Sequence, residues 1–227
     1  MMTKPVVAGQ EKSADDVKIL FDGSSLDAWR GYAAEPVGKG WTIDDKTLHF
    51  DGSGGGDIVT KEEFADFELT FEWRVAEGAN SGVMYRVGLG EKAPYLTGPE
   101  YQILDDDRHA DGKNELTSAA SLYALYAPND KKLSPVGEWN SAKVVAQGKR
   151  IEHWLNGKMV LDASIGAEDW NKRVAESKFK EWKKFATLSS GRICLQDHGN
   201  KIWFRDIRIK VLSKTPPAKK SPAPTQR

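Results

Sequence analysis

The stretch Phe67–Val75 constrains the fold more than any other, because apolar and polar residues alternate throughout it. Its sequence is FELTFEWRV. Successive side chains of a strand point to opposite faces of its sheet. The stretch is therefore predicted to be a strand with one buried and one solvent-facing side, which is typical of an antiparallel sheet.

Shorter runs of similar character predict further strands. We expect them at residues 83–87, 100–104, 121–126, 138–146, 151–155, 158–162, 191–196 and 201–212. Asn156-Gly157 separates two of these runs and favours a type I′ hairpin turn, which needs positive φ at both central positions. Many short strands joined by glycine-rich turns favour an all-β sandwich or barrel.

One segment breaks the β pattern. Residues 168–186 repeat apolar residues at about helical intervals, with charged residues between them. We predict one or two short helices packed on the sandwich. Lys178, next to Phe179 in this segment, is a candidate ligand contact, and a solvated helical crossover is the alternative.

The length of 227 residues is sufficient for one large β domain with its own core. We expect that domain at residues 18–212, after a flexible segment at 1–17. Residues 213–227 are rich in Pro and Lys and predict a disordered tail. Cys194 lies in an apolar run and is predicted to be a buried, unreactive thiol.

The charges are balanced, since Lys plus Arg and Asp plus Glu each total 33. Nucleic acid is therefore not expected as a partner. No apolar run has the length that spans a bilayer, and the first residues lack the apolar stretch of a signal peptide. We expect no membrane insertion, and the sequence leaves the oligomeric state open.

Gln196, Asp197 and His198 place an amide, an acid and an imidazole at the end of a predicted strand. Such a polar group at a strand-to-turn junction is typical of a site. In a regular strand Gln196 and His198 share one face, and Asp197 joins them only if Gly199 turns the chain. We predict His198 as an acid or base oriented by Asp197; a structural Asp and His at a turn is the alternative.

Glu100 and Gln102 share one face of another predicted strand, and Tyr101 and Ile103 share the other. If Tyr101 and Ile103 face the core, the carboxylate and the amide stand together on the open face. There they are suited to hold sugar hydroxyls, and Glu100 is suited to act as a general base. An exposed polar strand face is the alternative.

Asn80 precedes the predicted strand 83–87, and Arg86 lies in it. The five donors of a guanidinium suit the vicinal oxygens of a ligand. The alternatives are an ion pair of Arg86 with Glu100 or Asp105, and a simple turn at residues 80–82.

Residues 105–111, DDDRHAD, crowd four carboxylates around His109. The run is compatible with a divalent cation, although its spacing does not match an EF-hand, and no other cofactor is predicted. A solvated acidic loop is the alternative.

Trp139, His153 and Trp154 lie on strands that we expect to be neighbours. Indole faces stack on the apolar C–H faces of pyranose rings, and the chain has eight Trp. We predict that Trp139 and Trp154 line a cleft with His153, whereas Trp73 belongs to the core.

Several motifs follow one another along residues 18–212. They are LFDGSSLDAW, GDIVTKEEFADFELTFEWRV, NSGVMYR, GPEYQILDD, GEWN, EHWLNG, SKF and LQDHG followed by WFR. Together they resemble the domain of unknown function 1080 family, also known as the 3-keto-disaccharide hydrolase domain. The resemblance implies a concanavalin A-like jelly-roll sandwich and bacterial carbohydrate processing, often by exported proteins. An extracytoplasmic location is expected on that ground, although the chain shows no signal peptide.

The resemblance also implies hydrolysis of glycosides that carry a ketone at sugar carbon 3. Such a ketone acidifies the proton on C2, so a base can remove it, the C1 aglycone can leave, and water can then add. The candidates for base or acid are Glu100, His198 and Asp197. The candidates for contacts to substrate oxygens are Asn80, Arg86, Gln102 and Gln196. A metal that polarises the ketone is compatible with this chemistry but is not visible in the residue spacing.

A non-catalytic carbohydrate-binding module on the same sandwich is the alternative function, because a fold does not fix a function. A two-carboxylate glucanase would need the pattern E-x-D-x-x-E on one strand, which the sequence lacks.

Overall fold

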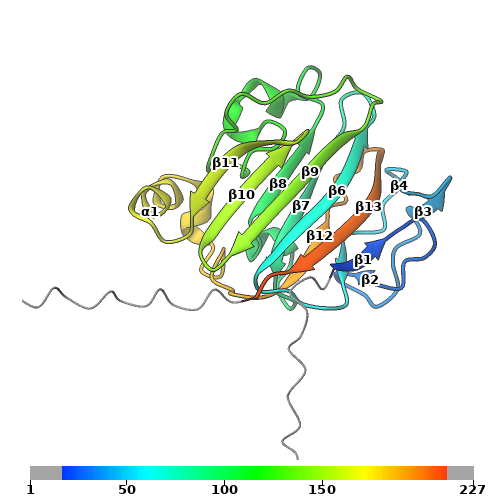
Figure 1. The fold of residues 1–227 in the computed structure, drawn as a ribbon, viewed down its shortest axis with the longest axis horizontal. Helices are drawn as coiled ribbons and strands as arrows, with labels where there is room; N and C mark the ends of the chain where they lie inside the picture. The colour runs from blue at the N-terminus through cyan, green and yellow to red at the C-terminus, as the bar shows by residue number, and fades with distance from the viewer. Residues whose placement is uncertain (1–16, 214–227) are drawn as a thin grey trace, which may run out of the picture.

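The computed structural model describes residues 17–213, which form two packed antiparallel β-sheets (Figure 1). The expected β-sandwich with short helices is confirmed. The predicted flexible N-terminal segment and Pro/Lys-rich tail lie almost wholly outside the described residues, although Val17 already belongs to the first strand. No helix among the described residues has the length and hydrophobicity to cross a membrane.

The larger sheet has eight strands. Their order is β11 (Lys158–Ser164), β10 (Arg150–Leu155), β9 (Asn140–Gln147), β6 (Phe67–Val75), β13 (Ile202–Val211), β4 (Thr47–Phe50) and β3 (Trp41–Asp44), with β1 (Val17–Phe21) also paired to β13.

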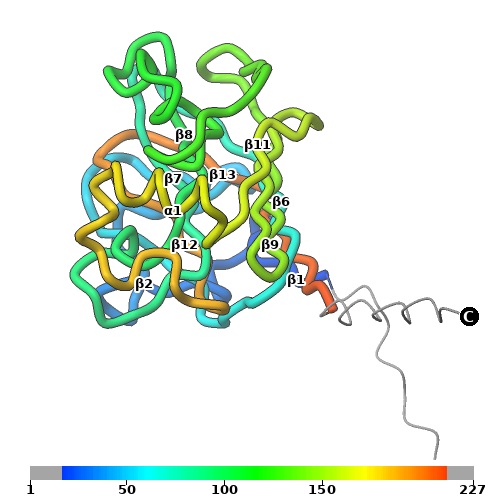
Figure 2. The backbone as a smooth tube through the Cα atoms, turned by 90° about the vertical axis from the view of Figure 1, so that its left-hand side faces the viewer, coloured from blue at the N-terminus to red at the C-terminus, as the bar shows by residue number. Residues whose placement is uncertain are grey.

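The smaller sheet has five strands. Their order is β2 (Trp29–Gly31), β5 (Ile58–Thr60), β12 (Arg192–Leu195), β7 (Asn80–Val87) and β8 (Glu100–Leu104). The helical elements are α1 (Glu168–Ala175) and the 3₁₀ turns η1 (Pro94–Leu96), η2 (Ala110–Lys113), η3 (Glu115–Thr117) and η4 (Lys178–Glu181). Figure 2 shows the two layers edge-on, with β6 and β9 on one side and β2 and β12 on the other.

The two sheets differ in what covers their outer faces. Residues of β6 alternate between buried and half-buried, as the sequence predicts for a strand with one side in water. Every residue of β7 and β8 is buried. The inner face of the smaller sheet packs on the larger one, and loops and short helices cover its outer face. Polar side chains on that outer face are therefore enclosed.

Most sequence predictions of local structure are confirmed. Asn156 and Gly157 have φ of 48° and 79°, as a type I′ turn requires. The segment 168–186 forms α1 and η4, and Cys194 is buried. The strand predicted at 121–126 is wrong, because the chain turns back on itself there, with φ of 66° at Ala120 and 58° at Ala124.

Candidate functional site

A cavity of about 290 Å³ lies over the outer face of the smaller sheet. Half of the residues predicted for the site line it together: Asn80, Glu100, Gln102, Lys178, Gln196 and His198. The first three come from β7 and β8, Lys178 begins η4, and the last two follow β12. Strand parity is why Glu100 and Gln102 point here, since Tyr101 and Ile103 face the core as predicted.

Gly82 lies directly beneath the Glu100 carboxylate, between two residues that line the cavity floor. It pairs with Gln102 across the β7–β8 ladder, and its carbonyl accepts a 3.0 Å hydrogen bond from the Gln196 N–H on the other side. A Cβ atom at Gly82 would lie 1.9 Å from Oε1 of Glu100. Only glycine therefore lets the carboxylate lie across this strand. Residues 80–82 belong to β7 rather than to the turn that the sequence left open.

Two acceptor oxygens of the lining residues lack a donor among the described residues. Oδ1 of Asn80 and Oε1 of Gln196 are buried without a hydrogen-bond partner in the described part of the chain. The amide nitrogen of Gln102 donates to the Thr117 carbonyl at 3.0 Å, so its Nε2 is already engaged. Because buried acceptors without a donor are unfavourable, these oxygens suit a ligand rich in hydroxyl groups.

The Glu100 carboxyl has a raised pKa, so it is half protonated at mildly alkaline pH. Its pKa is raised to about 8, chiefly by burial; the charge of Lys178 opposes this shift, and those of Asp57 and Asp111 add to it. The residue is only 8% exposed. A carboxylate with a pKa near the ambient pH is well matched to taking a proton from carbon.

Lys178 is the one Lys or Arg among the described residues that line the cavity. Its ammonium lies 4.4 Å from the ring centroid of Tyr123 and 5.5 Å from that of Trp182. Burial lowers its pKa, and the charges of Glu100 and Asp111 work in the opposite direction. The rings thus hold a cation inside the cavity, close to the buried carboxylate.

An aromatic wall closes the cavity opposite the floor. Phe179 stacks on Phe185 at 4.0 Å between centroids, and Tyr95 lies 5.3 Å from Trp182. The helical spacing of 168–186 predicted the packing of this segment but not what it packs on. Tyr95 stands in the short turn η1 and Tyr123 in a loop, where no sequence period marks them. The sequence placed Gly82 just before the predicted strand 83–87, in a possible turn.

His198 lines the cavity as predicted, and its ring lies 6.3 Å from that of His109. His109 is not among the lining residues, and its Nδ1 accepts the Asp111 N–H. Asp197 does not orient the imidazole. Its two carboxylate oxygens accept the N–H groups of Gly56 and Gly199, each at 2.9 Å, so it fixes the turn that carries His198.

Arg86 does not reach the cavity. Its guanidinium donates to the carbonyls of Ala65 and Gly148 at 2.8–3.0 Å and lies 3.2 Å from Asp66. Its φ of 52° accompanies an irregularity in the β12–β7 pairing, which breaks the strand parity on which the prediction rested. It is a structural arginine, and its partner is neither Glu100 nor Asp105.

His153 is fully buried between the sheets and not in a cleft. Its Nδ1 lies 3.1 Å from the Ala120 carbonyl, which can only accept, so Nδ1 carries the proton and Nε2 accepts the Tyr85 hydroxyl at 3.1 Å. Burial lowers its pKa to about 4. Because the Ala120 N–H donates to the carbonyl of Gln102, His153 supports the loop beside β8 from below.

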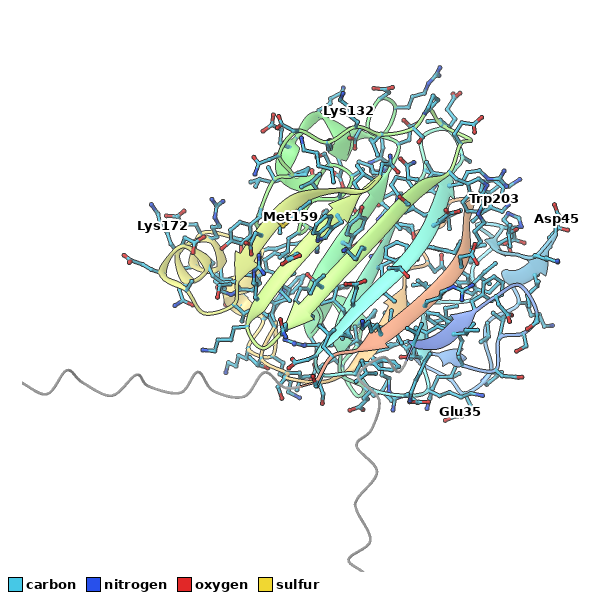
Figure 3. All side chains as sticks on the ribbon, viewed as in Figure 1. Glu35, Asp45, Lys132, Met159, Lys172 and Trp203 are labelled. Carbon is cyan, nitrogen blue, oxygen red and sulfur yellow. The ribbon has the colours of Figure 1, made fainter. Side chains whose placement is uncertain are left out.

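Trp139 and Trp154 lie on the other side of the sandwich, on the outer face of the larger sheet. Arg205 stands over the Trp139 ring at 4.2 Å, and Lys143 over the Trp154 ring at 3.9 Å. Figure 3 shows this face toward the viewer, with Trp203 labelled on it. The predicted cleft of Trp139, Trp154 and His153 is therefore wrong, because residues of opposite parity and different strands were combined.

The acidic loop at 105–111 is engaged in its own structure. The Asp105 carboxylate accepts N–H groups of Gly78 and Asp107, and Asp106 pairs with Lys131. Within residues 17–213, no group of three or more His, Cys, Asp and Glu side chains is arranged to hold a metal ion.

Comparisons with known proteins agree with this fold. The sequence model of a family described as the 3-keto-alpha-glucoside-1,2-lyase-like domain matches residues 16–210. The chain is 36% identical to a 3-keto-disaccharide hydrolase of Bacteroides thetaiotaomicron, over 88% of this chain and 79% of that protein.

Two crystal structures from Parabacteroides distasonis, both provisionally described as glycosyl hydrolases, also match. One superposes with a TM-score of 0.82 at 34% identity, covering 92% of this chain and 99% of the other. The second has a TM-score of 0.66 at 26% identity, covering 87% and 100%.

The buried imidazole predicts loss of stability in acid. His153 has a folded pKa of about 4, below that of a free histidine, so the unfolded chain binds the extra proton first. Its contribution is complete above about pH 6.5 and is lost as the pH falls toward 4, which amounts to roughly 3 kcal/mol of unfolding free energy. Urea titrations between these pH values measure it. His153→Gln should flatten this dependence; equal slopes in the two proteins would contradict the assignment.

The buried carboxylate predicts the opposite dependence. Because the folded pKa of Glu100 is raised from 4.5 to about 8, its burial is harmless at pH 4, opposes folding increasingly between these two values, and has a nearly constant cost at higher pH. Glu100→Gln keeps the shape without the charge. We expect it to match the wild type at pH 4 and to exceed it by about 2 to 5 kcal/mol at pH 9 in the same titrations. A variant that is less stable at pH 9 would show that the carboxylate is well compensated where it lies.

Proposed function

The chain belongs to the 3-keto-alpha-glucoside-1,2-lyase-like family, and on this premise we propose that it cleaves 3-keto-glycosides by elimination in the cavity above Gly82. The observation that carries the proposal is the placement of Glu100, a buried carboxylate with a raised pKa, beside the cation of Lys178. The description of the family names a 1,2-lyase, and the Bacteroides relative is named for hydrolysis of 3-keto-disaccharides.

The first step is removal of the C2 proton by Glu100. The electron pair of the C2–H bond moves into an enolate whose negative charge lies on the oxygen at C3. The Lys178 ammonium is the cation that stabilises this charge, in a site where burial strengthens the interaction. The acceptor oxygens of Asn80 and Gln196 bind hydroxyl groups of the ring and hold C2 toward the carboxylate.

The second step is loss of the aglycone. The enolate electrons return to restore the C3 carbonyl, a double bond forms between C1 and C2, and the bond from C1 to the glycosidic oxygen breaks. His198, at the exposed end of the cavity, supplies the proton to the leaving oxygen. Addition of water across the new double bond then gives the free 3-keto sugar, so the net reaction is hydrolysis.

The size of the cavity limits what enters it. A volume of about 290 Å³ corresponds to roughly ten water molecules, which is about the space of one sugar ring. The oxidised ring therefore occupies the floor, and the aglycone extends to the rim at Tyr95, which is 42% exposed.

Aglycone release tests the proposal directly. The protein is incubated with a 3-keto-glucoside and, separately, with the parent glucoside, and the free aglycone is measured. Release from the ketone alone is expected, because only the ketone acidifies the C2 proton. Saturable binding of the ketone without release would instead support the carbohydrate-binding module.

The pH profile of turnover is predicted to follow Glu100. A base acts when deprotonated, so kcat/KM should rise with pH through about 8. Glu100→Gln should reduce turnover by about 10² to 10⁴-fold. Lys178→Met removes the cation that favours the carboxylate and should move the rise to higher pH, whereas Lys178→Arg should largely restore the wild-type profile. A Met variant with an unchanged profile would remove Lys178 from the mechanism.

Gly82→Ala is predicted to abolish turnover, because the new methyl group would occupy the position of the Glu100 carboxylate. Val83→Ala is the control, since Val83 is the next residue of β7 and faces the core. The control should lose stability through its cavity, by about 1 to 3 kcal/mol, and keep its turnover. Thermal melts and aglycone release, measured on both variants, separate loss of stability from loss of turnover. An active Gly82→Ala enzyme would show that turnover does not need the Glu100 carboxylate to lie across Gly82.

A further inference from the structure

Tryptophans gather on the outer face of the larger sheet, away from the cavity. Trp139, Trp154 and Trp203 are each half-buried there, on side-chain positions that face solvent. Two hollows of about 500 and 360 Å³ lie on this face, and Asp206 lines both. We name the two hollows together the outer groove. In Figure 1 the central strands β9, β6 and β13 stand in front of the other layer, so the groove and the cavity are on opposite faces.

One end of the groove is a stack of planar side chains that crosses β4, β13 and β6 and ends at Trp139, just before β9. His49 stacks on Trp203 with 4.9 Å between centroids and 11° between planes. The Arg74 guanidinium lies 4.6 Å from the Trp203 ring and 4.9 Å from the Trp139 ring. Because stacking on their neighbours already restricts these side chains, little side-chain entropy is lost when a ligand contacts them.

Arg74 lines the groove without an ion-pair partner among the described residues. Its Nε is buried without a hydrogen-bond partner in the same part of the chain. Two ion pairs stand next to the stack, Arg205 with Glu72 and Arg208 with Asp206. Each presents a guanidinium beside a carboxylate, an arrangement that can donate to one hydroxyl and accept from its neighbour.

The charge of the lining excludes a strongly charged ligand. The acidic side chains are Asp22, Asp44, Asp45, Glu72 and Asp206. An equal number of basic side chains lines the groove: Lys46, Arg74, Lys143, Arg205 and Arg208. The lining therefore has no net charge, and a polyanion or a polycation would meet repulsion along it.

We propose that the outer groove binds a neutral oligosaccharide chain. Hydroxyl groups match the paired donors and acceptors, the apolar C–H faces of sugar rings match the indoles, and the absence of net charge matches a neutral chain. Trp154, with Lys143 over its ring, lines the second hollow, so each hollow offers at least one indole face to a sugar ring. This binding does not rest on the elimination proposed above, since it uses none of the cavity residues.

Calorimetry with the full chain tests the proposal. The probes are the neutral hexasaccharides cellohexaose, laminarihexaose and maltohexaose, with hexagalacturonate as the charged comparison. At least one neutral probe should bind to Glu100→Gln as well as to the wild type, with an affinity that is unchanged between about 50 and 500 mM salt. Trp139→Ala and, independently, Trp154→Ala should weaken it by about tenfold or more.

The controls distinguish the groove from the cavity. Both Trp variants should release aglycone from a small 3-keto-glucoside at the wild-type rate, so failure of one proposal leaves the other standing. The groove proposal is overturned by no binding of any neutral probe, by preference for the charged probe, or by binding that disappears in Glu100→Gln but persists in the Trp variants. If Trp139→Ala does not fold, Trp154→Ala gives the decision.

Discussion

The contact between the Glu100 carboxylate and the Cα of Gly82 is the constraint on which the candidate site depends. A carboxylate can lie across a neighbouring strand only where that strand has no side chain. Once it lies there, the covering loops and η4 remove it from water, and its pKa rises. The acceptor oxygens of Asn80 and Gln196 and the Lys178 ammonium then surround a carboxylate that can take up a proton near neutral pH.

An enclosed carboxylate weakens the fold that holds it, and the sandwich offsets this elsewhere. The inner faces of the two sheets form one apolar core, with Trp73, Phe71 and Phe204 among its fully buried members. Within that core the neutral His153 joins the sheets by bonds to Tyr85 and Ala120. The rigid layer beneath β8 thus carries the functional residues above it, as expected of a site preorganised on strands.

The sequence predicted what depends on strand parity and missed what depends on irregular backbone. Alternation was sufficient to place Glu100 and Gln102 on one face with Tyr101 in the core. The same reasoning failed at Arg86, where a positive φ changes the direction of the side chain, and at residues 121–126, where two alanines adopt positive φ. Tyr95 enters the site from the short turn η1 and Tyr123 from a loop, and only the tertiary fold brings such segments to a given strand.

The positions of the tryptophans on the two outer faces of the sandwich explain why the predicted cleft of Trp139 and Trp154 was wrong. Indole rings are equally suited to a cavity wall and to an open sheet face, so composition alone cannot assign them to either. On the covered sheet the ring that matters is Trp182, which comes from the segment after α1 and contributes to the cavity wall. On the uncovered sheet Arg74 lies over the rings of both Trp139 and Trp203, and His49 stacks on Trp203. Any polar residue would suit these solvent-facing positions, yet they hold an ordered stack of aromatic and guanidinium side chains. Such an ordered surface favours ligand binding, because little side-chain entropy is lost when a ligand contacts it.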